Sequence, residues 1–431
     1  MKRFLCLGLL ISIIWTANLF AQGEIRGTIY SQGEFKALDI SLMKFQTKHK
    51  WPEEESLAFQ ISEVIQRDLT FSMFFEFLEE NLFSFNDPAD LNPLDQDIWL
   101  RTEAQFVLAG KVESQSRTLK VDIFLYDAFA RKKTYSQTYR APETGWRRLA
   151  HEISNDVLFS LTGEKGIFNT KIAYIRETTN GKELYLCEFD GYNSQQVTFD
   201  KTINLSPNWS PDGKKVCYTS YKSGNPDLWE LQLETGKPRK IANFKGINTA
   251  ARYNPKSNQI ALTLSLENDP EIYLINPGGS NPKRLTYSYG IESSPTWSPN
   301  GKQIAFTSDR TGVPQIYVMD ADGSNVRRLS YGLSYCDSPA WSPNGDKIAF
   351  VSREPGGFQI YTIDITGENP HKLTDQGNNE NPSWSPDGYH LVFASSRTGK
   401  FEIYSMGWDG NHQTRITSGG GNFSPAWSPR F

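Results

Sequence analysis

The apolar and polar positions of residues 171–431 repeat with a step of 43 or 44 residues. Besides the aromatic residue named below, three other positions recur with this step. They are the start of a run like Lys-Ile-Ala-Phe, a second aromatic residue, and an aliphatic residue in a run like Arg-Arg-Leu-Ser. Each position occurs six times, which indicates a repeat architecture. The aromatic residues that follow a Ser-Pro-x motif, or its equivalent, are Trp209, Tyr253, Trp297, Trp341, Trp384 and Trp427.

Each repeat contains four short runs rich in β-branched and aromatic residues, with turn residues between them, so we predict four antiparallel strands. The first turn is Ser-Pro-Asp/Asn-Gly in four repeats. Proline fixes φ there, Asp or Asn bonds the following backbone, and glycine supplies a positive φ, which together predict a tight hairpin. The repeat with Asn254–Ser257 has no glycine at this turn, and we expect a looser hairpin.

Four strands in 43 or 44 residues are typical of a propeller blade, because a single such sheet must stack on neighbours to bury both faces. The run Pro425–Pro429 is a first strand without successors, and the run beginning at Lys171 has no Trp strand before it. We therefore predict that these fragments complete one blade. The fold class is then an all-β six-bladed propeller over residues 166–431, with four-stranded blades and no open edge in the ring.

Residues 22–165 lack this period and predict a separate α+β domain. Apolar residues from Leu57 to Leu69 recur at helical spacing, and a second helix runs from Trp146 to Leu161 and ends at Gly163. Strands are expected at residues 24–30, 37–45, 105–113, 118–126 and 132–139, with residues 106–110 central in a small mixed sheet. A polar loop spans residues 86–97. The linker at residues 164–169 is short, so we expect the two domains to touch.

Residues 1–21 predict a cleavable signal peptide, with a basic start, an apolar run and Ala21 at the cleavage site. Without Lys2 and Arg3 the mature chain has 43 basic and 49 acidic residues, which argues against a nucleic-acid partner. No other apolar run is long enough to span a bilayer. The three remaining cysteines have no metal-ligand spacing and predict buried apolar residues without a disulfide; they are Cys187, Cys217 and Cys336.

Several motifs together resemble one family: the signal peptide, the join Leu161–Phe168, the run Ser298–Ser330, and the terminal Ser424–Phe431. The whole chain is similar to the TolB family of periplasmic propeller proteins of the Tol-Pal system. The resemblance implies a monomeric, non-enzymatic scaffold without a cofactor. Its propeller would bind the peptidoglycan-associated lipoprotein Pal, its N-terminal segment would bind TolA, and it could contact further outer-membrane proteins. The system supports outer-membrane integrity and constriction at cell division.

Binding sites on propellers lie where loops enter the innermost strands, just before each Trp or Tyr. These residues vary between repeats while the flanking frame does not, which suits one asymmetric partner; ordinary polar turn residues are the alternative. The predicted partner-binding rim consists of Asn204, Asn248, Thr249, Glu292, Ser293, Asp337, Glu380 and Asn422. Arg310, Arg353 and Arg397 recur at a single repeat position, so we expect structural bonds from them.

The segment 22–31 contains two glycines and mixes polar and apolar residues, which indicates a strand able to pair with a partner's sheet edge. The predicted partner-binding residues are Glu24, Ile25, Arg26, Thr28, Ile29 and Tyr30. The segment lacks the acidic and Val-rich character associated with the family, so its TolA-like partner could differ in sequence as well.

The rival hypothesis is a periplasmic propeller enzyme of the lyase, lactonase or peptidase type. A lyase needs clustered His and acids at the channel, whereas the five His residues occupy unlike repeat positions. No nucleophile elbow, zinc helix or phosphate loop is present, and we predict neither catalytic residues nor a metal. Asn155 stands where a zinc motif beginning at His151 would need its second His, so His151 is expected on a helix surface. His371 and His390 are expected in solvent.

Overall fold

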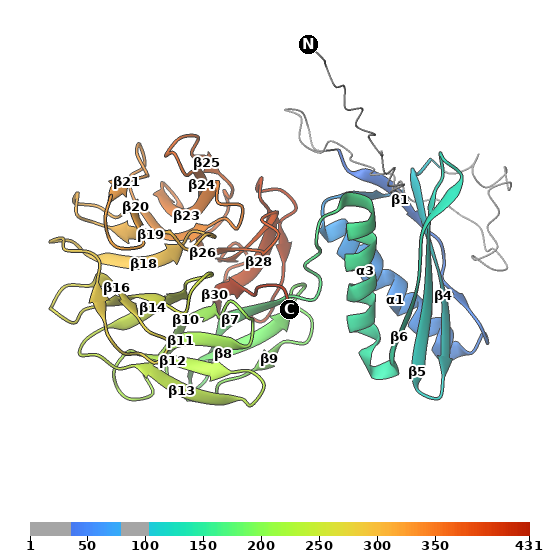
Figure 1. Ribbon diagram of the computed structural model, residues 1–431, viewed down its shortest axis with the longest axis horizontal. Helices are drawn as coiled ribbons and strands as arrows, with labels where there is room; N and C mark the ends of the chain where they lie inside the picture. Colours follow the sequence, from blue (N-terminus) through green and yellow to red (C-terminus); the bar gives the residue numbers. More distant parts are fainter. Residues whose placement is uncertain (1–35, 79–102) are drawn as a thin grey trace, which may run out of the picture. The chain divides into compact units, whose positions relative to one another are not determined.

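Each repeat forms one four-stranded antiparallel sheet in the computed structural model, which describes residues 36–78 and 103–431. The predicted signal peptide, the strand at 24–30 and the loop at 86–97 lie outside the described residues. In five blades the strands follow sequence order from the innermost strand outward, as Figure 1 shows for the propeller. The turn chemistry of the repeat explains this order, since each strand pairs with the next one along the chain.

The five sequential blades are as follows. The second blade comprises β10 (Asn204–Trp209), β11 (Lys215–Ser220), β12 (Asp227–Gln232) and β13 (Lys237–Ala242). The third comprises β14 (Asn248–Tyr253), β15 (Ile260–Leu264), β16 (Glu271–Ile275) and β17 (Lys283–Arg284). The fourth comprises β18 (Glu292–Trp297), β19 (Gln303–Ser308), β20 (Gln315–Asp320) and β21 (Arg327–Arg328). The fifth comprises β22 (Cys336–Trp341), β23 (Lys347–Glu354), β24 (Gly357–Asp364) and β25 (His371–Lys372). The sixth comprises β26 (Asn379–Trp384), β27 (His390–Ser395), β28 (Glu402–Gly407) and β29 (Thr414–Arg415).

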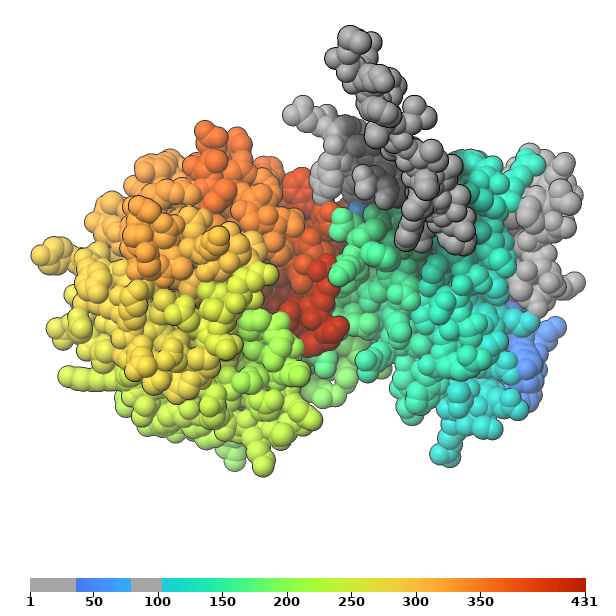
Figure 2. All heavy atoms as spheres, in the orientation of Figure 1, coloured from blue at the N-terminus to red at the C-terminus, as the bar shows by residue number. Residues whose placement is uncertain are grey.

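The first blade closes the ring, as the sequence predicts. Its order is β30 (Asn422–Trp427), β7 (Lys171–Thr178), β8 (Gly181–Glu188) and β9 (Gln195–Gln196). In the register of β30 and β7, Trp427 lies opposite Ile172. The backbone colours run round the propeller from green to red, and the C-terminal strand lies beside the first strand of the ring (Figures 1 and 2). The prediction of a six-bladed propeller is therefore confirmed.

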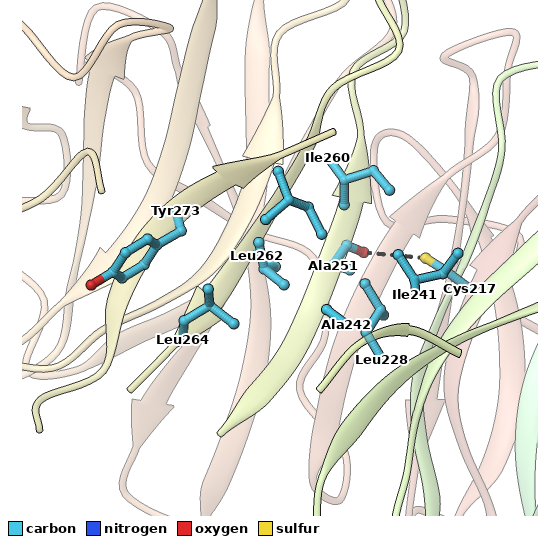
Figure 3. Packing of buried hydrophobic residues seen from close by; sticks show 10 residues of the cluster. Cys217, Leu228, Ile241, Ala242, Ala251, Ile260, Leu262, Leu264 and Tyr273 are labelled. Atoms are coloured by element: carbon cyan, nitrogen blue, oxygen red, sulfur yellow. Dashed lines mark hydrogen bonds between the residues drawn. The ribbon is translucent and has the colours of Figure 1, made fainter. Parts of the chain in front are cut away.

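The core of the propeller lies between the blades. In one cluster, Cys217 of β11 and Leu228 of β12 pack against Ala251 of β14 and Ile260 of β15, all of them buried (Figure 3). The Cys217 thiol donates to the carbonyl of Ala251 across this interface, at 3.8 Å. Burial raises the pKa of that thiol to about 12, so it stays protonated. The three cysteines are free and buried, and the prediction that they act as small apolar residues is confirmed.

In three repeats the indole N–H of the Trp joins its blade to the preceding blade, whereas that of Trp341 donates to Gly345 in its own hairpin at 3.4 Å. The indole N–H of Trp209 donates to the carbonyl of Ala426 at 2.9 Å, and that of Trp384 to the carbonyl of Ala340 at 3.0 Å. Trp427 donates to the Thr170 hydroxyl at 2.8 Å and so joins the last strand to the end of the linker. The predicted role of this position in contacts between blades is confirmed.

The N-terminal region is a mixed sheet with two helices. Its strand order is β3-β1-β4-β5-β6, with β2 pairing on β4, and β4 is central as predicted. The helices cover one face of the sheet in Figure 1. The elements are β1 (Leu38–Leu42), β2 (Gln46–Thr47), α1 (Pro52–Phe71), β3 (Phe75–Phe77), β4 (Phe106–Gln115), β5 (Thr118–Asp127), β6 (Lys132–Pro142), the 3-10 turn Glu143–Gly145 and α3 (Trp146–Thr162).

The residues at the helix ends explain where the helices begin and end. Pro52 opens α1, three glutamates occupy its first turn, and no basic residue lies in its last turn. Proline is favoured at that position because its missing N–H has no partner inside the helix. Gly163 ends α3 with φ of 75°, a left-handed conformation that glycine adopts without strain.

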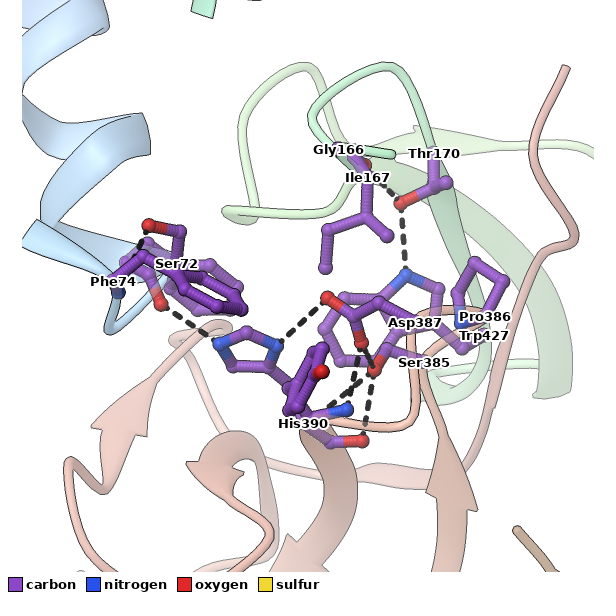
Figure 4. Close-up of polar contacts among 12 residues, drawn as sticks. Ser72, Phe74, Gly166, Ile167, Thr170, Ser385, Pro386, Asp387, His390 and Trp427 are labelled. Carbon is purple, nitrogen blue, oxygen red and sulfur yellow. Dashed lines mark hydrogen bonds and ion pairs between the residues drawn. The ribbon is translucent and has the colours of Figure 1, made fainter. Parts of the chain in front are cut away.

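Two histidines correct the predictions made for them. His390 is buried rather than solvated, and Figure 4 shows its ring beside Asp387, whose Oδ2 lies 3.2 Å from Nδ1. Its Nε2 lies 2.7 Å from the carbonyl oxygen of Phe71 at the end of α1, and its ring stacks on the Phe71 ring. His151 is buried rather than on a helix surface, with Nδ1 2.7 Å from Asp68 of α1. The partner that each histidine has on α1 is distant in sequence, so no local pattern indicated the contact. His371 is exposed, as predicted.

Contacts of this kind also confirm that the α+β region and the propeller touch. Arg147 of α3 donates through Nε to Glu188 of β8 at 2.7 Å, and through Nη2 to Asp190. His151 lies 3.4 Å from the same Glu188. The linker residue Gly166 and its neighbour Lys165 accept bonds from Arg430. No helix among the described residues is long and apolar enough to cross a membrane.

Candidate functional site

The six innermost strands share a backbone irregularity where they face the channel. Each has a register shift after its second residue, and its third residue has a positive φ near 50°, although none is glycine. Such a conformation is strained for residues with a Cβ, and it turns the strand as a β-bulge does. These residues are Ser206, Ala250, Ser294, Ser338, Asn381 and Ser424. A Ser-Pro or Asn-Pro dipeptide marks five of them, a signal that sequence reasoning did not use.

The bulged strands surround a cavity of about 360 Å³ in the centre of the ring. Its wall consists of Ser, Thr, Asn, Pro, Ala and Trp side chains together with Tyr253 and one charged residue, Arg252. The cavity runs from the bulges to the Ser-Pro turns that follow the Trp residues. Every blade contributes, so the ring closure seen at β30 is also what completes the wall of the channel.

The residue at the start of each innermost strand is buried within the blade. Asn204, Asn248, Glu292 and Asn422 each have zero exposed fraction. Asn204 donates to Glu183, and Asn422 donates to Glu402 at 2.6 Å. Glu292 forms an ion pair with Arg310 at 3.0 Å. These four predicted rim residues therefore stabilise the loops that enter the channel and are not exposed to a partner.

The arginines that recur at one repeat position divide into two groups. Arg310 and Arg397 make the structural bonds expected of them: Arg310 pairs with Glu292, and Arg397 donates to the side chains of Asn379 and Ser395. Arg353 is exposed, and its side chain forms no hydrogen bond or ion pair with another residue that the structure describes. The expectation of a structural role fails for Arg353 because its blade has Cys336 where the fourth blade has Glu292.

The second residue of each innermost strand is partly exposed at the mouth of the channel. Thr249, Ser293, Asp337 and Glu380, the other predicted rim residues, lie here. Leu205 and Phe423 occupy the same position in the remaining two strands. The mouth therefore has an acidic sector in the fifth and sixth blades and an apolar sector in the first and second blades.

The acidic sector contains a small pocket of about 230 Å³. Asp337 and Glu380 line it together with Tyr335 and Phe358. Asp337 accepts bonds from the Thr307 hydroxyl at 2.8 Å and from the backbone N–H of Ser338. Burial and the charge of Asp337 raise the pKa of Glu380. A cationic group that entered this pocket would relieve that repulsion.

Exposed apolar side chains lie on the loops that lead into four of the innermost strands, β10, β14, β18 and β22. Ile203, Ile247 and Ile291 immediately precede three of these strands and are 44%, 39% and 51% exposed. The loops add four larger residues, all more than half exposed: Phe199, Tyr287, Tyr289 and Tyr331. We call these seven residues the apolar rim. Sequence reasoning missed it because the prediction was confined to the first two residues of each innermost strand.

An apolar rim on four blades of a partly acidic mouth is suited to a protein partner. Exposed aromatic and aliphatic residues that lie together typically mark protein interaction sites, whereas single exposed apolar residues are ordinary. The described residues include no group of three or more His, Cys, Asp or Glu side chains arranged to hold a metal ion.

Comparisons with known proteins agree with this architecture. A family profile described as the TolB beta propeller domain matches residues 159–431, and one described as the TolB amino-terminal domain matches residues 30–134. The crystal structure of TolB from Acinetobacter baumannii has a TM-score of 0.82 and 28% identity, and the match covers 92% of this chain and 97% of that one.

Relatives named Tol-Pal system protein TolB match over shorter stretches. The protein from Desulfosudis oleivorans is 36% identical over 231 residues, which cover 52% of this chain and 51% of the relative. The protein from Geobacter sulfurreducens is 38% identical over 166 residues, or 38% of each chain. The matched stretches thus cover about half of the length of these curated relatives, or less. Because the propeller profile covers well over half of the sequence, this chain belongs to the TolB family of the Tol-Pal system.

Proposed function

We propose that this chain is a non-enzymatic periplasmic scaffold whose propeller mouth binds a peptidoglycan-associated lipoprotein of the Pal type. The observation that carries the proposal is the apolar rim beside the acidic sector. Three isoleucines at equivalent positions and four larger residues around them are exposed on one set of loops. Burying such residues drives protein association, and an aromatic or aliphatic centre bordered by charge is the usual composition of a binding hot spot.

The four partly exposed rim residues would set the orientation of the partner. Asp337 and Glu380 would receive a basic group of the lipoprotein, while Thr249 and Ser293 would supply polar contacts on the third and fourth blades. Charge complementarity of this kind contributes mainly to specificity and to the rate of association. Outer-membrane integrity and constriction at division would then depend on a link between this scaffold, the lipoprotein and the inner membrane.

A pull-down from envelope extract tests the proposal. The tagged full-length chain is expected to recover a lipid-anchored peptidoglycan binder. The triple variant Ile203→Ser, Ile247→Ser, Ile291→Ser should weaken that capture roughly a hundredfold, because each partly exposed isoleucine contributes about 1 kcal/mol when buried. Phe129→Ser is the matched control, since Phe129 is 74% exposed but belongs to the turn between β5 and β6.

The outcomes of this experiment are distinct. Recovery of the lipoprotein by the wild type and the Phe129 variant, with loss in the triple variant, supports the proposal. If no such lipoprotein is recovered, or if the triple variant recovers as much as the wild type, the mouth is not its binding site.

For the second partner, we propose that the segment 22–31 pairs with a TolA-like inner-membrane protein. Its residues Glu24 to Tyr30 lie outside the described residues, so the proposal depends on the composition of the segment and on membership of the family. Deleting residues 22–31 should abolish binding of the TolA-like protein and leave binding of the lipoprotein intact. Loss of both interactions would contradict a separate site in this segment.

A further inference from the structure

One charged side chain lies in the wall of the channel at a position that is uncharged in every other blade. Arg252 of β14 is the single Asp, Glu, Lys, Arg or His among the described residues that line the central cavity. The residue before Trp or Tyr in the other innermost strands is Asn208, Thr296, Ala340, Ser383 or Ala426. The third blade therefore departs from the repeat at the place where its strand faces the cavity.

The guanidinium of Arg252 forms no ion pair with a described carboxylate. Its Nη1 donates to the carbonyl of Ala251 at 3.0 Å, and an arginine has five N–H donors in all. Glu230, on the neighbouring blade, is already engaged with Lys215 at 3.3 Å and Arg239 at 3.1 Å. Burial lowers the pKa of the Arg252 guanidinium from its ordinary value. The charge is thus partly removed from solvent, and no described acid pairs with it.

The backbone around Arg252 is held firmly in place. The indole N–H of Trp297 donates to the carbonyl of Arg252 at 3.1 Å, and the hydroxyl of Tyr253 donates to Glu230 at 2.7 Å. Ala250, two residues earlier, has a φ of 52° and faces the cavity. A strand fixed in this way holds Arg252 in the wall of the cavity.

The walls near Arg252 carry neutral hydrogen-bonding groups and no competing anion. Asn208 and Thr296 occupy the equivalent positions in the two adjacent blades, and Ser294 and Ser206 lie at the adjacent bulges. Amide and hydroxyl groups of this kind complete the coordination of an oxyanion whose charge an arginine binds through two parallel N–H bonds. A cavity of about 360 Å³ has room for a small carboxylate or phosphate together with water.

We propose that the channel of the propeller is an oxyanion-binding site centred on Arg252. The ligand is a carboxylate or a phosphate, because these groups match the planar fork of the guanidinium. It comes either from a small molecule free in solution or from an acidic side chain that the bound lipoprotein inserts into the channel. The site differs from the acidic sector of the mouth, which favours a cation.

Isothermal titration of the full-length chain with citrate, acetate and inorganic phosphate tests the free-ligand source. A second titration, with the soluble domain of the lipoprotein, tests the source carried by the partner. Both are performed with the wild type, Arg252→Gln, Arg252→Lys and Arg415→Gln. Arg415, which is exposed on the outermost strand β29, provides the same change of charge away from the channel. Thermal melting verifies that each variant is folded.

In at least one titration, the affinity of Arg252→Gln is expected to be about tenfold weaker or more than that of the wild type. A hydrogen bond to a charged group changes the equilibrium constant by at least about a factor of ten. Arg252→Lys should retain part of the binding, and Arg415→Gln all of it. Weakening in the citrate or phosphate titration identifies a free ligand, and weakening in the lipoprotein titration alone identifies a side chain of the partner.

The proposal is overturned if neither titration changes in Arg252→Gln while that variant melts as the wild type does. It is also overturned if Arg415→Gln weakens binding equally, since general charge would then account for the effect. Failure of the lipoprotein to bind the wild type at all would reject the proposed function of the mouth. The citrate and phosphate titrations would still decide whether the channel binds an oxyanion.

Discussion

Replacing His151 with Gln should make the stability of the chain less dependent on pH. His151 has 3% exposed area and lies among charged groups from three elements: Asp68 of α1, Arg147 of α3, and Glu188 and Asp190 at the end of β8. Burial disfavours its charged form, but hydrogen bonds with Asp68 and Glu188 outweigh burial and raise its pKa to about 9. We regard the imidazolium as the folded form because two carboxylates contact the ring.

The magnitude follows from proton linkage. The folded-state pKa of about 9 lies above the ordinary value of 6.5, so stabilisation by His151 is complete below pH 6.5 and is lost as the pH rises toward 9. One pH unit between these values is worth about 1.4 kcal/mol. The free energy of unfolding that His151 contributes should therefore fall by roughly 2–3 kcal/mol between pH 6.5 and pH 8.5.

Urea denaturation of the wild type and of His151→Gln at pH 6.5, 7.5 and 8.5 measures this contribution as a difference. Taking the difference at each pH cancels groups that titrate equally in both proteins. His371→Gln is the matched control, since His371 is exposed on β25, and its difference from the wild type should not change with pH. A difference for His151→Gln that stays constant over this range would refute the assigned ion pairs.

Three further substitutions test the packing of the ring and its contact with α1. Trp427→Ala should reduce the free energy of unfolding by about 3–5 kcal/mol, because it leaves a cavity and removes the hydrogen bond to Thr170. Urea denaturation measures the loss, and a loss below about 1 kcal/mol would contradict closure of the ring by β30. Arg310→Ala should reduce the free energy of unfolding by about 3 kcal/mol or more, because it leaves Glu292 buried without its ion pair. Adding Glu292→Gln to this variant should restore part of the lost stability, which thermal melting measures. His390→Ala should accelerate amide exchange in the last turn of α1 by about tenfold, and unchanged exchange there would argue against the contact with that helix.

The ring could be predicted from the sequence because its information is local and is repeated six times. A step of 43 or 44 residues, a proline-containing turn and a Trp or Tyr in each repeat determine the sheet, its strand order and its contacts with the neighbouring blade. The pairing of β30 with β7 required one inference about two incomplete repeats, and it is confirmed by Trp427 lying opposite Ile172. The helices α1 and α3 were equally accessible, since their apolar spacing is regular.

The site was harder to predict because it depends on which way each side chain points. The predicted rim treated two consecutive residues alike, but neighbours in a strand face opposite sides. Asn248 is buried under its own loop, whereas Thr249, next to it, is partly exposed. The buried His151 and His390 were missed for a related reason, because their partners on α1 are distant in sequence and no local pattern announces them.

Site-specific photo-crosslinking in living cells tests the central claim most directly, namely that the mouth of the ring binds the lipoprotein. A photoreactive residue is placed at Thr249 in the mouth or, as a control, at Arg415 on the outermost strand. We predict an adduct with the peptidoglycan-associated lipoprotein from position 249 and none from position 415. Adducts from position 415 alone, or no adduct with that lipoprotein from either position, would contradict the account.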